Sequence, residues 1–382
     1  MRKIAAVLVC CLILGLLPGK AKAADLNVAA KSAVLMDVET GTVLYEQNPH
    51  ESLAPASVTK VMTLLLIMEA IDSGKILWED TVTASEEAAA KGGSQIFLKV
   101  GESMSVLDMV KSIAVSSAND AACAMAEHLA GSESAFVEQM NQRAKELGME
   151  NTHFVNCTGL DDDPDAKEHR TSAYDIALMS RELLKNHPDI TKFTTIWMDT
   201  VRDGAFGLSN TNKMVRFYSG CTGLKTGFTS GAGYCLSAAA RRDGLELIAV
   251  VMGSETSKDR FAACKGMLDY GFANYALYTP QLLEGASVPV KLGHAEAVAA
   301  VPGAETALLV DKAQRGSITA EIALEEFVTA PVSQGQRLGE LTVRSGEQIL
   351  ARIPLVAAHP VTRLRVADLM GLILRRVAMA KR

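Results

Sequence analysis

Ala54-Pro55-Ala56-Ser57-Val58-Thr59-Lys60 stands directly before an apolar run, Val61 to Ile67, and Gly74 follows about two helical turns later. This pattern predicts a buried helix from Ser57 to Ser73. Residues three apart share a helix face, so the Lys60 amine can reach the Ser57 hydroxyl. A serine becomes a good nucleophile only when a nearby base takes its proton, and a buried lysine with a lowered pKa is such a base. Taken alone, S-x-x-K is better explained as a plain helix N-cap followed by a surface lysine.

A second short motif is Ser117-Ala118-Asn119, in the gap between two predicted helices. A serine there can relay a proton, and an asparagine amide can hold a peptide carbonyl. On its own the motif is an ordinary interhelical turn with a cap residue, so it is weak.

A third motif is Lys225-Thr226-Gly227, at a position where a strand should precede a hairpin. The lysine would supply positive charge for an anionic substrate group and would depress the pKa of Lys60. Thr226 offers a hydroxyl, and Gly227 lets substrate approach the backbone closely. A glycine-rich turn is the plain alternative. The three motifs in this order are typical of penicillin-binding proteins and class A β-lactamases.

The chain resembles the low-molecular-mass D-alanyl-D-alanine carboxypeptidases over Ala54 to Thr63, Val115 to Ala122, His169 to Leu184 and Thr222 to Ser237. The surroundings of the third motif are similar to those of Gram-positive sporulation-type members. One departure is Ala118, where many relatives have glycine.

The resemblance implies an acyl-enzyme on Ser57 that releases the terminal D-alanine of peptidoglycan pentapeptides, with no metal or other cofactor. It implies that Lys60 accepts the Ser57 proton and that Ser117 and Lys225 assist its transfer. Asn119 would hold substrate, and the backbone N–H groups of Ser57 and Phe228 would form the oxyanion hole. Arg260, Thr226 and Gly227 complete the implied substrate site, Arg260 by helping to bind the terminal carboxylate. β-Lactams would acylate the same serine.

Other functions are compatible with parts of this sequence. A class A β-lactamase needs a glutamate followed three residues later by asparagine, and Glu168 lacks that partner. A Ser-His-Asp hydrolase is disfavoured because no G-x-S-x-G elbow exists and because His153 and His169 are more simply capping or core residues. A D,D-endopeptidase on the same fold and a non-catalytic wall-binding protein stay open.

The order of predicted elements indicates an α+β fold. Hairpins are expected at residues 34–45 and 235–252, the second around an Asp243-Gly244 turn. Between them helices are expected near 105–116, opened by the capping box Ser105-Val106-Leu107-Asp108, and near 120–130, 133–147 and 172–186. This suggests an antiparallel sheet flanked by helices, with an inserted helical subdomain, as in the penicillin-binding/β-lactamase fold. We expect this catalytic domain to occupy residues 24–280.

A different texture follows in residues 281–360. Ile318 to Glu325 alternates apolar and polar residues, and the pattern returns at Leu341 to Arg344 and at Ile349 to Leu355. It predicts a small all-β domain of sandwich type, with no titratable cluster.

The two ends of the chain carry different signals. Residues 1–23 have a cationic start, an apolar run too short to span a bilayer, and Ala21-Lys22-Ala23 before a cleavage point, which predicts a secretory signal. Residues 361–382 combine arginines with an apolar face at helical spacing and predict an amphipathic helix on the membrane surface. A helix packed on its own domain is the alternative. Together they predict an exported protein on the outer, wall-facing side of the cytoplasmic membrane.

Composition sets further limits. In a chain of 382 residues, 48% are hydrophobic and 21% charged, the balance of an ordinary globular protein. A net charge of −6 and export argue against nucleic acid as a partner. Five cysteines remain beyond the signal (Cys123, Cys157, Cys221, Cys235 and Cys264), an odd and irregularly spaced set that forms no disulfide framework and no zinc motif. Whether Cys221 and Cys235 pair is left open.

Overall fold

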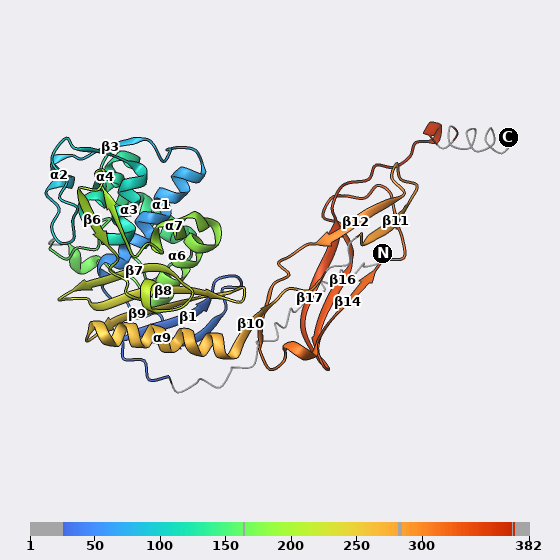
Figure 1. Cartoon of the computed structure of the whole chain (residues 1–382). Coiled ribbons are helices and arrows are strands. Elements are labelled where there is room, and N and C mark those ends of the chain that lie inside the picture. Colours follow the sequence, from blue (N-terminus) through green and yellow to red (C-terminus); the bar gives the residue numbers. More distant parts are fainter. Residues whose placement is uncertain (1–25, 163–164, 282–284, 369, 371–382) are drawn as a thin grey trace, which may run out of the picture.

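A computed structural model describes residues 26–162, 165–281, 285–368 and 370. Figure 1 shows a larger body of helices and strands, coloured blue to yellow, and a smaller β body, coloured orange to red. Strand β10 (Tyr275–Tyr278) leads from the first body to the second, where it pairs with β13 (Leu308–Asp311).

The helices of the described residues are α1 (Lys60–Asp72), α2 (Glu86–Ala89), α3 (Val106–Ser116), α4 (Asn119–Ala130), α5 (Glu133–Glu146), α6 (Ala173–Asn186), α7 (Thr191–Thr194), α8 (Met214–Phe217) and α9 (Ser257–Asn274), with short 3₁₀ turns η1 (Ala56–Thr59), η2 (Ala166–Glu168), η3 (Pro188–Ile190) and η4 (Arg315–Ser317). The strands of the first body are β1 (Ser32–Asp37), β2 (Val43–Gln47), β3 (Thr81–Thr83), β4 (Ser103–Ser105), β5 (Met198–Val201), β6 (Phe206–Ser209), β7 (Cys221–Thr229), β8 (Gly233–Arg242) and β9 (Leu245–Ser254).

A five-stranded antiparallel sheet in the order β2-β1-β9-β8-β7 divides the first body. Successive side chains of a strand point to opposite faces, so each central strand serves two cores. On β1, Val34 and Met36 face the core shared with α1, α3, α4 and α6, whereas Ala33 and Leu35 face the core shared with α9. Strand β7 is left at an edge of this sheet, next to the helical subdomain.

Capping residues define where the long helices of the subdomain begin. The hydroxyls of Ser105, Ser132 and Ser172 each accept a hydrogen bond from the backbone N–H three residues later, at the starts of α3, α5 and α6. Thr256 does the same for α9. The capping serine at the start of α3 was predicted from sequence, and its helix begins where the pattern placed it.

The second body is a six-stranded sheet in the order β14-β16-β17-β12-β11-β15, with two small hydrophobic clusters. Its remaining strands are β11 (Ser287–Lys291), β12 (Ala297–Pro302), β14 (Ile318–Leu324), β15 (Val328–Thr329), β16 (Arg337–Ser345) and β17 (Gln348–Ala357). The strictly alternating stretch at Ile318 is β14, paired antiparallel with β16. The α+β fold with an added β domain is confirmed.

The structure adds detail at three predicted features. The helix expected from Ser57 begins as the 3₁₀ turn η1 and becomes α-helical only at Lys60. The predicted hairpins are β1–β2 and β8–β9, the second with the Asp243-Gly244 turn. Cys221 and Cys235 are free thiols, because Cys235 lies opposite Gly227, far along the β7–β8 ladder from Cys221.

The predicted secretory signal lies outside the described residues, as does most of the predicted C-terminal helix. Within the described part of the chain, no helix combines the length and apolar character needed to cross a membrane.

Candidate active site

The turn that carries Ser57 is held from two sides by glycines. Ala56 adopts a left-handed φ of 48°, and the Ser57 that follows it is half-buried. A Cβ at Gly227 of β7 would lie 2.7 Å from the Pro55 carbonyl oxygen and 3.0 Å from the Ser57 nitrogen. A Cβ at Gly159 would collide with the Ala56 carbonyl oxygen. The serine turn is therefore fixed between a loop and the edge strand, where only glycine fits.

Lys60 lies directly beneath Ser57 on the next turn. Its ammonium nitrogen is 3.0 Å from the Ser57 hydroxyl oxygen and donates to the Thr158 carbonyl at 2.7 Å. The side chain is fully buried. Burial lowers the pKa of Lys60 to about 7, although Cys157, Asp120 and Glu133 partly oppose the shift. The predicted serine–lysine contact is thus formed, with a lysine that is partly neutral at neutral pH.

The second motif forms the junction of α3 and α4. Ser117 has a left-handed φ of 64° that ends α3, and its side chain is buried. Asn119 opens α4; its Nδ2 donates to the Gly92 carbonyl at 2.7 Å, while its Oδ1 is buried with no partner among the described residues. An unpartnered buried acceptor is costly unless a ligand supplies the donor. In this orientation the amide offers Oδ1 to a substrate N–H and a second N–H to a carbonyl.

Lys225 and Thr226 lie on β7, at the edge of the sheet. The Lys225 ammonium donates to the Thr226 carbonyl at 3.0 Å and is buried. Its pKa is lowered well below the usual lysine range, first by burial and then by repulsion from Lys60 and Arg260. The sequence predicted that Lys225 would depress the pKa of Lys60; burial is the main cause at Lys60, and the repulsion appears at Lys225 itself. Thr226 donates to the Thr211 hydroxyl at 2.7 Å.

The end of β7 carries Phe228, which is 53% exposed and stacks on Tyr234 with ring centroids 4.2 Å apart. Phe228 pairs with Tyr234 in the β7–β8 ladder, so its backbone runs along the same strand as the third motif. The exposed ring forms part of the rim of the site.

Arg260 reaches the site from α9, on the other side of the sheet. Its Nη1 donates to the carbonyls of Gly227 at 2.9 Å and Cys235 at 3.3 Å, and its guanidinium lies over the rings of Tyr234 and Phe261. Judged by its helix alone it would be a surface residue, but it is buried. Its Nε has no hydrogen-bond partner among the described residues. Arg260 thus braces β7 behind the third motif.

His169, which the sequence predicted to be a capping or core residue, lies next to the site. Its Nδ1 accepts from the Val155 N–H at 3.0 Å, so Nε2 carries the proton and donates to the Thr59 hydroxyl at 2.8 Å. Thr59 in turn donates to the Ala56 carbonyl. Burial lowers the pKa of His169 to about 4. The neutral imidazole therefore braces the serine turn from behind, as a core histidine and not as a member of a Ser-His-Asp triad.

Asp120 is an unassigned neighbour of the site, next to Asn119 in the sequence. Its buried carboxylate accepts from the backbone N–H groups of Ile96 and Leu98. This ties the loop at residues 92–98 to the start of α4, and the same loop supplies the Gly92 carbonyl to Asn119. An acid directly after S-x-N was visible in the sequence, but its loop partners lie about twenty residues upstream, so only the fold reveals them.

Comparison with known proteins adds the family. The sequence pattern described as D-alanyl-D-alanine carboxypeptidase matches residues 19–256. The chain belongs to the D-alanyl-D-alanine carboxypeptidase family. It is accordingly a penicillin-binding, serine-type peptidase that releases the terminal D-alanine, which confirms the enzyme class and activity predicted from the sequence. Residues 281–363 match a second pattern, the C-terminal domain of penicillin-binding protein 5.

Individual relatives agree with this assignment. The chain is 45% identical over 342 residues to D-alanyl-D-alanine carboxypeptidase DacF of Bacillus subtilis, covering 88% of this chain and 87% of the relative. Penicillin-binding protein 5 of Haemophilus influenzae has a similar structure, with a TM-score of 0.75 and 31% identity over 88% of this chain and 98% of that protein. Penicillin-binding protein D2 of Listeria monocytogenes, solved in its ampicillin-bound form, gives a TM-score of 0.57 and 33% identity over 65% of this chain and 100% of that protein.

Proposed function

We propose that Ser57 is the nucleophile of this carboxypeptidase and that Lys60 is its general base. The observation that carries the proposal is the 3.0 Å contact between the Lys60 nitrogen and the Ser57 hydroxyl, together with the lowered pKa of Lys60. Only a neutral lysine can accept the serine proton, and a pKa of about 7 leaves a large share of molecules neutral at physiological pH. The free lone pair of that amine then faces the hydroxyl.

Catalysis proceeds in two steps. Ser57 attacks the carbonyl of the penultimate D-alanine while its proton passes to Lys60, and the terminal D-alanine leaves after receiving a proton through Ser117 and the neighbouring lysines. Water then hydrolyses the ester on Ser57. The backbone N–H groups of Ser57 and Phe228 stabilise the oxyanion of each tetrahedral intermediate. The close approach of Gly227 to the Ser57 nitrogen supports this role for the two backbones.

Recognition of the substrate uses charge and backbone. Asn119, with its unpartnered acceptor, holds the peptide on the helical side of the site. On the other side, the substrate lies along the β7 edge, and Lys225, Thr226 and Arg260 attract the terminal carboxylate. Burial and repulsion from Lys60 and Arg260 lower the pKa of Lys225, so a carboxylate bound beside it would favour the charged ammonium.

β-Lactams bind the same site in this proposal. They acylate Ser57, and the ester is released slowly because the leaving amine stays tethered. The ampicillin-bound form of the Listeria protein supports this.

The test compares D-alanine release by the wild type and Ser57→Ala from a peptide ending in Lys-D-Ala-D-Ala. We expect release by the wild type and a loss on the order of 10⁴-fold or more in the variant. Ser73→Ala, at the opposite end of α1, is the matched control and should keep wild-type activity. A mass increase with benzylpenicillin should appear in the wild type and the control alone. Release by Ser57→Ala at the wild-type rate would refute the assignment.

A parallel assay with a cross-linked muropeptide separates carboxypeptidase from endopeptidase action. Release of free D-alanine without separation of the cross-linked strands is expected. Cleavage of the cross-link at a higher rate would make the endopeptidase alternative the main activity.

The organisation of the chain is part of the same proposal. Residues 24–280 carry the catalysis and residues 281–360 form a separate β domain, which is supported by the separate hydrophobic clusters of the two bodies. Limited proteolysis of the penicillin-labelled protein should cut first near residue 281 and leave the label on the larger fragment. A label on the smaller fragment would refute this division.

Export and membrane attachment complete the proposal. Residues 1–23 direct export and are removed, and residues 361–382 lie on the outer face of the membrane, as their arginine-flanked apolar face supports. Mass spectrometry of the secreted protein should place its start at Ala24. Flotation with anionic vesicles should require residues 361–382, and equal flotation without them would contradict the proposed attachment.

A further inference from the structure

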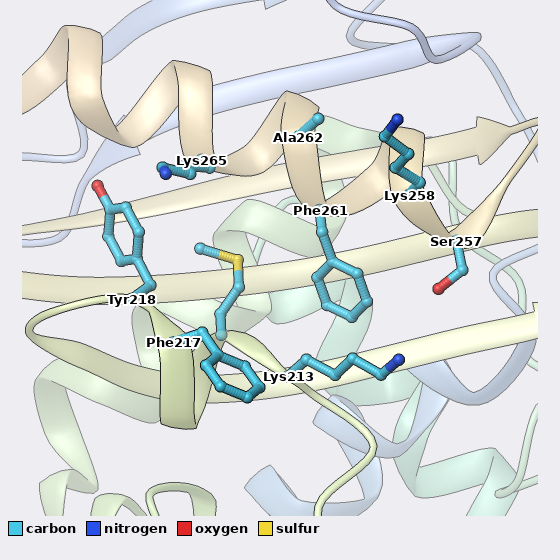
Figure 2. Close-up of a pocket in the computed structure, with 9 residues that line it drawn as sticks. Lys213, Phe217, Tyr218, Ser257, Lys258, Phe261, Ala262 and Lys265 are labelled. Carbon is cyan, nitrogen blue, oxygen red and sulfur yellow. The ribbon is translucent and has the colours of Figure 1, made fainter.

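A pocket lies outside the active site, between α8 and the first half of α9. Its volume is about 550 Å³, within the range of pockets that hold small-molecule ligands. Figure 2 shows its walls: Phe217 and Tyr218 come from the α8 side, and Ser257, Lys258 and Phe261 from the helix opposite. We call it the α8–α9 pocket. None of the residues assigned to catalysis lines it.

The surface of the α8–α9 pocket is aromatic and partly exposed. Phe217 is 72% exposed, an unusual state for a phenylalanine, and its ring meets that of Trp197 edge-on with centroids 6.1 Å apart. Phe261 and the buried Met214 add further apolar surface. An exposed aromatic surface at the mouth of a hollow is typical of a binding site.

Three exposed lysines, Lys213, Lys258 and Lys265, surround this apolar surface. Across the described ranges, none of the three forms an ion pair, and no acidic residue lines the pocket. Elsewhere on the same body, lysines such as Lys111 and Lys192 contact carboxylates. On a chain with a net charge of −6, three unpaired lysines around one hollow form a local site for anions.

Two short segments of the chain link the walls of the pocket to the active site. On one side, Thr211 accepts from Thr226, and the next residue but one in the chain, Lys213, lines the pocket. On the other side, Arg260 braces Gly227 from the same turn of α9 that contributes Ser257 and Phe261. Because β7 is an edge strand and α9 covers the face of the sheet opposite the serine turn, a polymer bound along β7 would reach the pocket by passing around this edge.

We propose that the α8–α9 pocket binds a second segment of the peptidoglycan strand whose stem peptide occupies the active site. This rests on the proposed function. The chemistry fits on both counts: stem peptides carry carboxylates, which the three lysines attract, and sugar rings present apolar C–H faces that stack on the phenyl rings of Phe217 and Phe261. Each reaction also creates a new terminal carboxylate on the polymer, so the product keeps its charge complementarity to the pocket. The concave shape favours a strand over a membrane surface, which meets a convex helix face.

The test separates the polymer from the isolated peptide. The variant Lys213→Ala/Lys258→Ala/Lys265→Ala and the single variant Phe217→Ala are compared with the wild type on a soluble Lys-D-Ala-D-Ala peptide and on purified, insoluble peptidoglycan. We expect D-alanine release from the short peptide to stay within twofold of the wild type, and release from peptidoglycan to fall about tenfold. Co-sedimentation with peptidoglycan, measured in the Ser57→Ala background so that substrate is not consumed, should weaken to the same degree. Binding by the wild-type pocket should also weaken with added salt.

The matched control is Lys99→Ala/Lys145→Ala/Lys192→Ala, which removes the same charge from exposed positions on other elements. An equal loss in this control would assign the effect to overall charge and overturn the proposal. Undiminished co-sedimentation of the pocket variants would overturn it too, as would binding of anionic lipid vesicles in place of peptidoglycan. A wild type inactive on the short peptide would instead refute the proposed function, whereas the co-sedimentation result would still report on the pocket.

Discussion

The two bodies of this protein differ in whether they bury polar side chains. Between Ser32 and Arg260 the first body buries a set of polar and charged residues that includes Lys60, Lys225, Asp120 and His169. Among described residues 285–368 of the second body, every fully buried side chain is apolar. Both bodies have well-formed sheets, so the difference does not come from secondary structure.

The comparison shows where the free-energy cost of function lies. Burying an ammonium group such as that of Lys60 destabilises the charged form by several kcal/mol, and such strongly perturbed groups cluster at functional sites. The second body carries no such group in its described part, which suits a spacer or partner-binding module. Matched substitutions in the two bodies test this difference.

The largest effect is expected for Lys60→Met. Release of D-alanine should fall by on the order of 10³-fold or more because the base is lost. At pH 7 the free energy of unfolding should rise by on the order of 2–4 kcal/mol, since methionine fills the site without a buried charge. The folded pKa of about 7 lies below the unfolded value of 10.5, so the unfolded wild type binds more protons between these pH values. Wild-type stability should therefore increase with pH across that window, and the variant should lack the increase.

Lys291→Met is the counterpart in the second body. Lys291 is exposed and lies over the Phe327 ring, so its loss should cost no more than about 1 kcal/mol and leave activity intact. Urea unfolding and D-alanine release measure both variants. Destabilisation by Lys60→Met would contradict the cost assigned to the buried lysine.

The next largest effect on stability is expected when one of two glycines is replaced by alanine. Gly159 and Gly335 share a φ of 79°, but a Cβ at Gly159 collides with the Ala56 carbonyl, whereas one at Gly335 meets nothing within 4 Å. Alanine should cost about 1 kcal/mol at Gly335 from backbone strain alone. At Gly159 the clash adds to the strain, for a total of roughly 3–5 kcal/mol and a strong loss of activity. Thermal unfolding of both variants measures the difference, and equal losses would show that the glycine does not fix the serine turn.

The buried His169 of the first body should make the free energy of unfolding depend on pH. Its pKa of about 4 lies below the unfolded value of 6.5, so the unfolded chain binds more protons between those pH values. Stability is fully present above pH 6.5 and falls by up to about 3 kcal/mol as the pH drops to 4. His169→Gln should flatten this part of the profile while lowering stability at pH 7. An unaltered slope in His169→Gln would contradict the neutral buried histidine.

The smallest effect, on kcat/KM, is expected when one of two arginines is replaced by glutamine. The Nε atoms of Arg260 and Arg344 are both buried without a hydrogen-bond partner among the described residues, one in each body. Arg260→Gln removes the bond to the Gly227 carbonyl and should reduce kcat/KM about tenfold, mainly through KM. Arg344→Gln should leave kcat/KM unchanged. Equal effects on catalysis would mean that Arg260 acts only through general stability.

Local pattern explains most of the correct predictions about the fold. The alternation at β14, the Asp243-Gly244 turn between β8 and β9, and the capping serine of α3 each depend on neighbours a few residues away. The start of α1 was placed less well, because the 3₁₀ turn at Ser57 is imposed by contacts from Gly159 and Gly227, both distant in the sequence.

The chemistry proposed for this protein could be predicted from the sequence alone, since S-x-x-K, S-x-N and K-T-G indicate the groups proposed to react. The serine–lysine contact also followed from it, because residues three apart meet on any helix. The contacts that support the site became visible only in the tertiary structure. His169 bonds Thr59, Asp120 holds the loop at residues 92–98, and Arg260 bonds the Gly227 carbonyl. These contacts join segments far apart in the chain, and burial, which shifts the pKa of Lys60, is a property of the whole packed body. The unpaired lysines of the α8–α9 pocket likewise became a site only when the chain brought them around one hollow.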